Sequence, residues 1–151
     1  MSPSFVPDHF EPPLTLTDDG FRLEPLGPQH NERDHEAWMS SIEWIQSTPG
    51  YSADGDWPKP MSQESNLEDL EMHARHFEER SGFTYSILDG DEIIGCLYIY
   101  PTAEPDHDAS IRSWVKESRS EMDIPVYQAV VEWIEKSWPF HSVQYAPRPS
   151  A

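Results

Sequence analysis

The stretch that decides the fold runs from Phe83 to Tyr145 and reads FTYSILDGDEIIGCLYIYPTAEPDHDASIRSWVKESRSEMDIPVYQAVVEWIEKSWPFHSVQY. Its first part alternates Phe83, Tyr85 and Ile87 as a strand does. The dipeptide Asp89-Gly90 is a strong signal for a two-residue hairpin turn. The run from Ile93 to Tyr100 that follows is apolar on both faces, which predicts a central strand covered on both sides.

The second part of this stretch predicts a strand, a helix and a last strand. Residues Ala109 to Val115 alternate in character, and Val126, Val130 and Trp133 then recur on one face of a helix over Ile124 to Ser137. Val143 and Tyr145 make a short final strand. Strands joined by a helix are parallel with a right-handed crossover, so this end of the sheet should be parallel.

Upstream of this stretch the sequence predicts one strand and two helices. Residues 21–26 alternate as a half-buried strand, and residues 31–46 read as a helix with Trp38, Ile42 and Ile45 on one face. A second helix starts at a capping box of Ser65 and Glu68 and ends at Ser81-Gly82. The expected order is β-α-α-β-β-β-α-β, an α/β (α+β) fold with a mixed, mostly antiparallel sheet flanked by helices.

The length of 151 residues suits one domain, which we expect over residues 20–146. Residues 1–19 contain four prolines and little periodicity, so they predict an extended arm that packs through Phe5 and Phe10. Residues 147–151 form a C-terminal tail. The last predicted strand leaves an open edge, which either a homodimer or the proline-rich tail could cover.

The composition excludes several classes of function. The formal charge is -18 with only three lysines, which disfavours nucleic-acid binding and favours the approach of a cationic substrate, although acidity also serves solubility. No run of 18 apolar residues is present, so we expect no membrane span. The single Cys96 cannot form an intrachain disulfide, which favours a cytoplasmic location.

The order of elements resembles the GCN5-related N-acetyltransferase (GNAT) superfamily. The resemblance is carried by the segments 21–26, 91–99, 109–115 and 118–123. It implies transfer of an acyl group from acetyl-CoA to the amine of a small molecule or peptide. It also implies that Ser113, Trp114 and Val115 hold the pantetheine arm of the cofactor, and that Arg119 and Ser120 hold its phosphates.

The loop expected to bind the diphosphate departs from the family pattern. Met122, Asp123 and Ile124 stand where the family has closely spaced glycines, so we predict a divergent member without a glycine-rich pyrophosphate loop. Glu121 would repel phosphate, and Asp123 is expected to cap the following helix itself. The alternative is therefore a degenerate binding or assembly module without CoA-dependent catalysis.

The sequence does not assign a catalytic residue. Candidates for a general base near the strand ends are Glu92, Glu104 and Asp108, none of which the pattern distinguishes from a surface carboxylate. Cys96 lies inside an apolar strand, which favours an inert core thiol.

Two weaker patterns remain. The pairs His73 with His76, close to Glu71, and His30 with His35 have a helical spacing, but scattered histidines without a metal-binding motif favour no metal site. The long loop over residues 48–64 is flanked by Trp44, Tyr51 and Trp57 and contains Asp54 and Asp56. These residues either form a pocket for a cationic amine or fasten the loop to the body of the protein.

Overall fold

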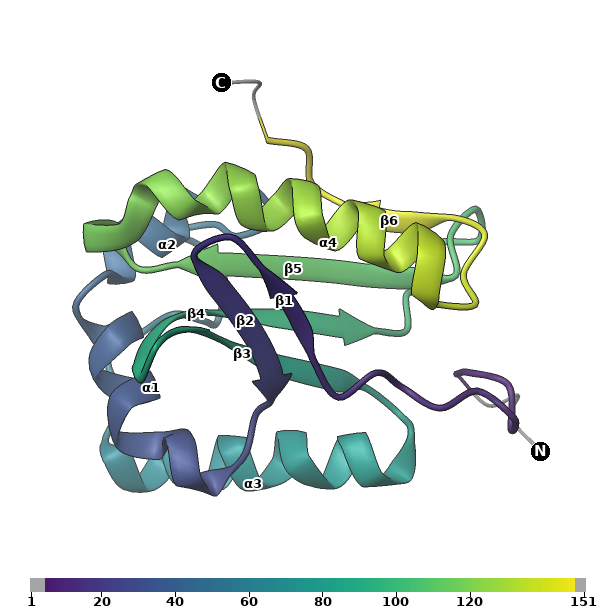
Figure 1. The fold of residues 1–151 in the computed structure, drawn as a ribbon. Helices are drawn as coiled ribbons and strands as arrows, with labels where there is room; N and C mark the ends of the chain where they lie inside the picture. Colours follow the sequence, from purple (N-terminus) through teal and green to yellow (C-terminus); the bar gives the residue numbers. More distant parts are fainter. Residues whose placement is uncertain (1–4, 149–151) are drawn as a thin grey trace.

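Six strands form a single sheet in the chain order β1-β2-β3-β4-β5-β6, as the computed structural model describes for residues 5–148 (Figure 1). The strands are β1 (Leu16–Asp18), β2 (Phe21–Pro25), β3 (Phe83–Asp89), β4 (Glu92–Tyr100), β5 (Ala109–Val115) and β6 (Val143–Tyr145). All neighbouring pairs are antiparallel except β5 and β6, which are parallel. The predicted mixed, mostly antiparallel sheet is confirmed.

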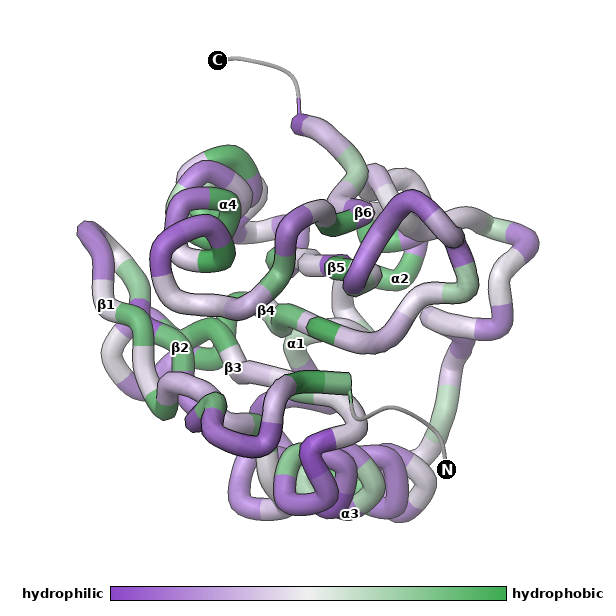
Figure 2. The backbone as a smooth tube through the Cα atoms, turned by 90° about the vertical axis from the view of Figure 1, so that its right-hand side faces the viewer, coloured by the Kyte–Doolittle hydropathy of each residue, from purple (hydrophilic) through white to green (hydrophobic). Residues whose placement is uncertain are grey.

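Helices cover both faces of the sheet. They are α1 (Asn31–Met39), α2 (Ile42–Gln46), α3 (Gln63–Glu79) and α4 (Asp123–Ser137), with short 3₁₀ helices η1 (Pro28–His30) and η2 (Glu117–Met122). One core cluster lies between the sheet and α4, and a second lies between the sheet and α1, α2 and α3. In Figure 2 the hydrophobic residues follow the strands, while hydrophilic residues cover the outer turns of α3.

The hairpin of β3 and β4 is confirmed, with its turn one residue later than predicted. Asp89 pairs with Glu92, so Gly90 and Asp91 form the turn. Gly90 has a φ of +61°, a left-handed conformation that glycine adopts without the cost of a Cβ.

A bulge in β4 decides which residues face which helices. The pairing shifts from Leu88–Ile93 to Ile87–Gly95, which leaves Ile94 without a partner on β3. Because one residue is inserted, Ile94 and Leu97 both pack on the side of α4, three positions apart. The residues from Cys96 onward then alternate so that Tyr98 faces α1 and α3.

Two helix predictions need correction. The single helix over residues 31–46 is interrupted, and α2 starts after Ser41, whose hydroxyl accepts a hydrogen bond of 2.9 Å from the Glu117 amide. The start of α3 is capped by Ser62, whose side chain accepts from the Ser65 amide, so Ser65 is not the cap.

The end of α3 also differs from the prediction. The left-handed residue is Arg80, with a φ of 64°, and not a glycine. Its guanidinium donates 2.7 Å hydrogen bonds to the Pro7 and Phe10 carbonyls. Arg80 therefore holds the N-terminal segment against the domain, which explains why the sequence tolerates a strained residue here.

The N-terminal segment packs as predicted but contains a strand that the sequence analysis missed. Phe5 stacks on Phe140 at 5.3 Å, and Phe10 lies 5.2 Å from Trp138. The short strand β1 pairs with β2, so the sheet begins inside the expected arm of residues 1–19. The domain boundary at residue 20 and the tail 147–151 stay predictions, and residues 1–4 and 149–151 lie outside the described residues.

Gly95 allows β4 to approach β5 closely. A Cβ at this position would lie 2.1 Å from the carbonyl oxygen of Trp114, a backbone atom that cannot move aside without shifting β5. Any side chain here would therefore force the two central strands apart.

We predict that Gly95→Ala lowers the free energy of unfolding by about 3 kcal/mol, because the new methyl overpacks the β4–β5 contact. Chemical denaturation followed by circular dichroism measures this. Gly55→Ala is the matched control: its Cβ would meet its nearest neighbour at 3.4 Å, and we expect a change within about 0.5 kcal/mol. Equal stabilities of the two variants would contradict the assigned role of Gly95.

Candidate functional site

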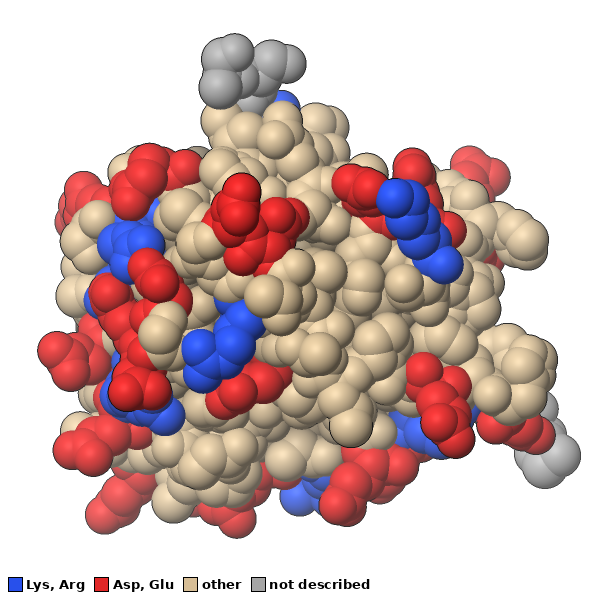
Figure 3. Space-filling view, in the orientation of Figure 1, with Lys and Arg blue, Asp and Glu red and all other residues tan. Residues whose placement is uncertain are grey.

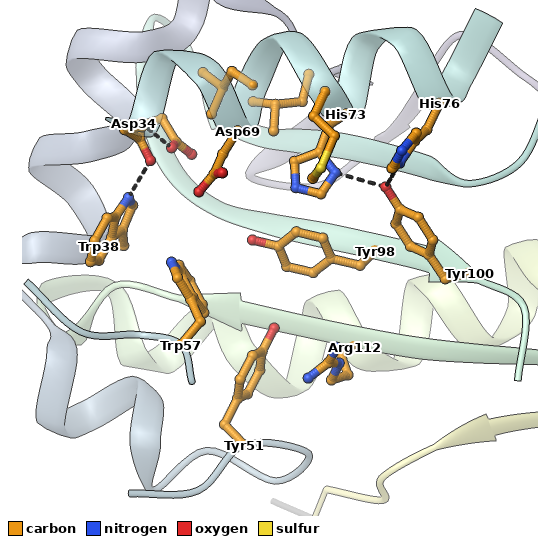
Figure 4. Close-up of a pocket in the computed structure, with 14 residues that line it drawn as sticks. Asp34, Trp38, Tyr51, Trp57, Asp69, His73, His76, Tyr98, Tyr100 and Arg112 are labelled. Carbon is orange, nitrogen blue, oxygen red and sulfur yellow. Dashed lines mark hydrogen bonds between the residues drawn. The ribbon is translucent and has the colours of Figure 1, made fainter. Parts of the chain in front are cut away.

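A pocket of about 350 Å³ lies on the face of the sheet that carries α1 and α3 (Figure 4). Its walls come from α1, α3, β4, β5 and the long loop between α2 and α3. The polar residues that line it include Asp34, Asn66, Asp69, His73, His76 and Arg112.

Two periodicities bring these residues together. Asp69, His73 and His76 lie one helical turn apart along one side of α3, as the spacing of an α-helix requires. On the sheet, Tyr98 is the register partner of Arg112, so the two side chains stand beside each other on the same face.

Aromatic rings form most of the pocket wall. Trp57 lies 5.2 Å from Trp38, 5.9 Å from Tyr51, 6.4 Å from Tyr98 and 6.0 Å from Trp114 between ring centroids. Trp57 therefore both fastens the long loop to the sheet and closes one side of the pocket. Tyr51 and Trp57 thus both fasten the loop and line a pocket, and binding of a cationic amine there stays a prediction.

The carboxylates of the pocket are not those that the sequence suggested. Asp54 and Asp56 are exposed and do not line the pocket. Trp44 does not line it either, and its indole donates a 3.0 Å hydrogen bond to the Val115 carbonyl. Asp34 and Asp69 take the place of Asp54 and Asp56. They were missed because they lie on separate helices whose packing brings them together.

Asp34 is a buried carboxyl. The Asn66 amide donates to it at 3.1 Å, and the Asn66 oxygen accepts from the Trp38 indole at 3.0 Å. Burial raises the pKa of Asp34 to about 6, against the lowering effect of the Asn66 hydrogen bond. Asp34 can therefore exchange a proton close to neutral pH. Burial likewise raises the pKa of Asp69 above its ordinary value, and the charge of Glu68 adds to this.

The two histidines of the pocket share one tyrosine hydroxyl. His73 Nδ1 and His76 Nδ1 lie 2.7 Å and 3.0 Å from the Tyr100 oxygen. Burial, followed by the charge of His76, lowers the pKa of His73 to about 4, so this ring is neutral at pH 7. Gly82 gives the Tyr100 ring its space, because a Cβ there would lie 2.1 Å from it.

The histidine pairs do not build a metal site in the described part of the chain. Within residues 5–148 no group of three or more His, Cys, Asp or Glu side chains is placed to hold a metal ion. His30 lies 2.7 Å from Glu24 Oε1, and His35 lies 2.6 Å from the Met61 carbonyl, so each holds a separate local contact. No helix in this part of the chain has the length and apolar character that a membrane span requires.

The three candidate bases of the sequence analysis lie outside the pocket. Glu92 pairs with Lys116 at 2.6 Å, and Asp108 accepts from the backbone amides of His141 and Ser142. Glu104 is exposed. Cys96 is fully buried, which raises the pKa of its thiol well above the ordinary value and fits an inert core residue.

The residues expected to hold the pantetheine arm have partners inside the protein. The Trp114 indole donates to the Tyr98 hydroxyl at 3.1 Å, and Val115 is buried. Ser113 is the decisive residue: β6 ends at Tyr145, so the Ser113 carbonyl has no strand partner on that side of β5. It accepts a 2.8 Å hydrogen bond from Arg148 instead.

Arg148 fills the space between β5 and the start of α4. Its side chain is 1 % exposed, and it pairs with Asp123 at 2.9 Å. Its guanidinium also lies over the rings of Tyr127 and Tyr145, at 5.7 Å and 5.6 Å. The predicted capping role of Asp123 is wrong, because its carboxylate binds Arg148 and the residue at the cap position is Met122.

The loop expected to bind phosphate is a 3₁₀ helix, η2, and its basic residue, Arg119, is already paired with carboxylates. Arg119 pairs with Asp89 at 2.8 Å, Glu92 at 3.1 Å and Glu121 at 3.3 Å. Figure 3 shows acidic side chains spread over this face of the molecule, with the basic ones next to them. Ser120 is exposed, and its carbonyl accepts from the Asp123 amide at the start of α4.

Comparison with known proteins gives a likeness of fold. No family model matches the chain, and no curated protein matches it by sequence. Among solved structures, RimL, a ribosomal L7/L12 alpha-N-protein acetyltransferase in complex with coenzyme A, has a TM-score of 0.62 at 21% identity, over 79% of this chain and 66% of RimL.

Two further solved structures are similar to the same degree. The ribosomal-protein-S5-alanine acetyltransferase from Vibrio fischeri has a TM-score of 0.66 at 13% identity, over 88% of this chain and 73% of that protein. RimJ from Mycobacterium smegmatis, in complex with CoA-disulfide, has a TM-score of 0.65 at 15% identity, over 86% and 63%. The chain thus spans about two thirds of the length of these proteins and has a GNAT-like fold.

The raised pKa of Asp34 predicts a specific pH dependence of stability. Between the ordinary pKa of 3.8 and about 6 the folded state binds more protons than the unfolded state, so the contribution of Asp34 is lost as the pH rises through this interval. The free energy of unfolding of Asp34→Asn, taken relative to that of the wild type, should therefore rise by about 2 kcal/mol between pH 4 and pH 7. Urea denaturation at both pH values measures this, with Asp54→Asn as the control for loss of one negative charge. A pH-independent difference for Asp34→Asn would refute the assignment.

Proposed function

We propose that this chain is an acetyltransferase-like protein whose pocket binds an amine, and that the associated reaction is acyl transfer from acetyl-CoA to that amine. The fold supports this, because two solved proteins with the same fold are described as acetyltransferases of ribosomal proteins. Two of the similar structures contain coenzyme A or its disulfide. The acceptor would then be a peptide or small-molecule amine.

The observation that carries the proposal is the pocket with both aromatic walls and carboxylates. An ammonium group is attracted to the faces of Trp and Tyr rings, and it pairs with carboxylates such as Asp69. The formal charge of -18 also attracts a cation from solution. These features together favour a positively charged ligand.

The same pocket offers a group to take the proton of the amine. An amine must lose a proton before it attacks an acyl carbon, and an efficient base has a pKa near the working pH. The Asp34 carboxyl, with a pKa of about 6, meets this requirement. We infer that Asp34 accepts the proton of the amine, either directly or by way of Asp69. His73 is neutral, so it adds no positive charge that would compete with the ammonium group for these carboxylates.

The residues on the other side of β5 do not fit acetyl-CoA in the described arrangement. Arg148 occupies the Ser113 carbonyl that an extended pantetheine arm would need, and three carboxylates surround Arg119. Segment 116–124 has no glycine through which phosphate could approach the backbone. We therefore assign no step to the cofactor.

This mismatch supports a second candidate function. The chain would be a binding module that keeps the amine pocket without CoA-dependent catalysis. The observation in its favour is the buried Arg148–Asp123 pair, because displacing Arg148 would leave Asp123 without its partner.

Calorimetry with acetyl-CoA separates the two functions. We expect weak or no binding to the wild type, because Arg148 and the carboxylates around Arg119 oppose it. Arg148→Ala should bind at least about tenfold more tightly, since it frees the Ser113 carbonyl, and should then acetylate peptide or small-molecule amines. Lys136→Ala, which removes a positive charge paired with Glu132 on the outside of α4, is the control.

The possible outcomes differ for each candidate. Micromolar binding by the wild type would refute the binding module and our interpretation of Arg148. Absence of both binding and acetylation in the wild type and in a folded Arg148→Ala would refute the acetyltransferase proposal. Circular dichroism checks folding, because loss of a buried ion-pair partner costs several kcal/mol, roughly 3–5.

A further inference from the structure

Three polar side chains that line the pocket have no hydrogen-bond or ion-pair partner among residues 5–148. The Tyr51 hydroxyl is buried and makes no hydrogen bond. The Asp69 carboxylate and the Arg112 guanidinium line the same pocket, and neither forms an ion pair or a side-chain hydrogen bond within the described residues. A buried hydroxyl without a partner costs free energy, so its presence calls for an explanation such as a ligand.

Arg112 is the only Lys or Arg side chain among the described residues that line the pocket. Other basic side chains also lack a carboxylate partner, but the guanidinium of Arg80, for example, donates to backbone carbonyls instead. Arg112 lies over the Tyr51 ring at 5.5 Å and has no carboxylate beside it, in a chain with 28 acidic residues. A planar guanidinium with free donors is the side chain best suited to bind a carboxylate.

The opposite charges stand on different walls of the pocket. Asp69 comes from α3 and Arg112 from β5, and Figure 4 shows them on opposite sides of Tyr98. The space between them is lined by the Tyr98 and Trp57 rings, which suit an apolar or aromatic body. The volume of about 350 Å³ is at the small end for ligand pockets.

We propose that the pocket binds a small aminocarboxylate whose ammonium and carboxylate groups are separated by an apolar body. The ammonium pairs with Asp69, the body packs on Trp57 and Tyr98, and the carboxylate binds Arg112. The Tyr51 hydroxyl, close to the Arg112 end, donates the remaining hydrogen bond to the ligand. The ligand would be the acceptor of the proposed acyl transfer, and this role rests on that proposed function. Binding of the ligand to the pocket does not depend on it.

The anionic end distinguishes this ligand from a polypeptide N-terminus. In a polypeptide, the carboxyl group of the N-terminal residue is part of a neutral peptide bond. It would therefore leave Arg112 without a charged partner. A small aminocarboxylate satisfies Asp69, Arg112 and Tyr51 at once, so the observations favour it.

Binding of three matched probes tests the proposal. They are 4-(aminomethyl)benzoate, benzylamine without the carboxylate, and benzoate without the ammonium. Calorimetry and quenching of tryptophan fluorescence report binding, since Trp38 and Trp57 line the pocket. We expect 4-(aminomethyl)benzoate to bind the wild type at least about tenfold more tightly than either single-charge probe.

Two variants assign the charges to residues. Arg112→Gln should reduce the affinity for 4-(aminomethyl)benzoate to that for benzylamine, and Asp69→Asn should reduce it to that for benzoate. Arg75→Gln, at an exposed position of α3 outside the pocket, should leave all three affinities unchanged. Asp69 and Arg112 are not core residues, and thermal melting confirms that each variant is folded.

Three results would overturn the proposal: no saturable binding of 4-(aminomethyl)benzoate, equal binding of benzylamine, or an unchanged preference in Arg112→Gln. Equal binding of benzylamine would favour a peptide or simple amine instead. No acetyl-CoA is present in these experiments. If acyl transfer is not detected, the binding of 4-(aminomethyl)benzoate still stands. If 4-(aminomethyl)benzoate does not bind, the acetyl-CoA measurements are unaffected.

Discussion

The close approach of β4 and β5 at Gly95 is the constraint on which the site depends. The bulge at Ile94 comes one residue earlier and changes the phase of β4, so that Tyr98 faces α1 and α3. With the strands in contact, Tyr98 stands beside Arg112. Without the bulge, alternation would turn Tyr98 into the core under α4, and the pocket would lose a wall.

Strand β5 serves two different environments because its side chains alternate. Arg112 faces the pocket, while Ser113 faces Arg148 and the Tyr145 hydroxyl on the side of α4. Ser113 is thus the direct neighbour in sequence of the pocket residue Arg112, although the two side chains lie on opposite faces of the sheet.

The buried Arg148 replaces a missing strand partner at a cost. Removing a guanidinium and a carboxylate from water is unfavourable, and the Asp123 pair and the Ser113 carbonyl offset that penalty only when all partners are in place. The two tyrosine rings beside the guanidinium add a further attraction. The arrangement therefore favours one position of the chain near residue 148 over a loosely attached one.

By itself, the sequence determined the elements with strong local signals. The β3–β4 hairpin, β5, α4 and the parallel β6 follow from alternation, turn residues and helical spacing, which are properties of neighbouring residues. It also determined the acidic character and the absence of glycine in segment 116–124. The N-terminal cap of α3 was misplaced by three residues, because several serines could each act as a cap. The break at Ser41 was missed altogether, because it depends on a hydrogen bond from the distant Glu117 amide.

Only the tertiary structure decided which residues share a site. Asp34 and Asp69 meet because α1 packs on α3, and neither carries a local signal that separates it from a surface carboxylate. Arg148 lies outside every predicted element, yet it reaches Ser113, 35 residues away in sequence. Such contacts depend on packing between distant segments, and the pattern of neighbouring residues along one sequence does not encode them.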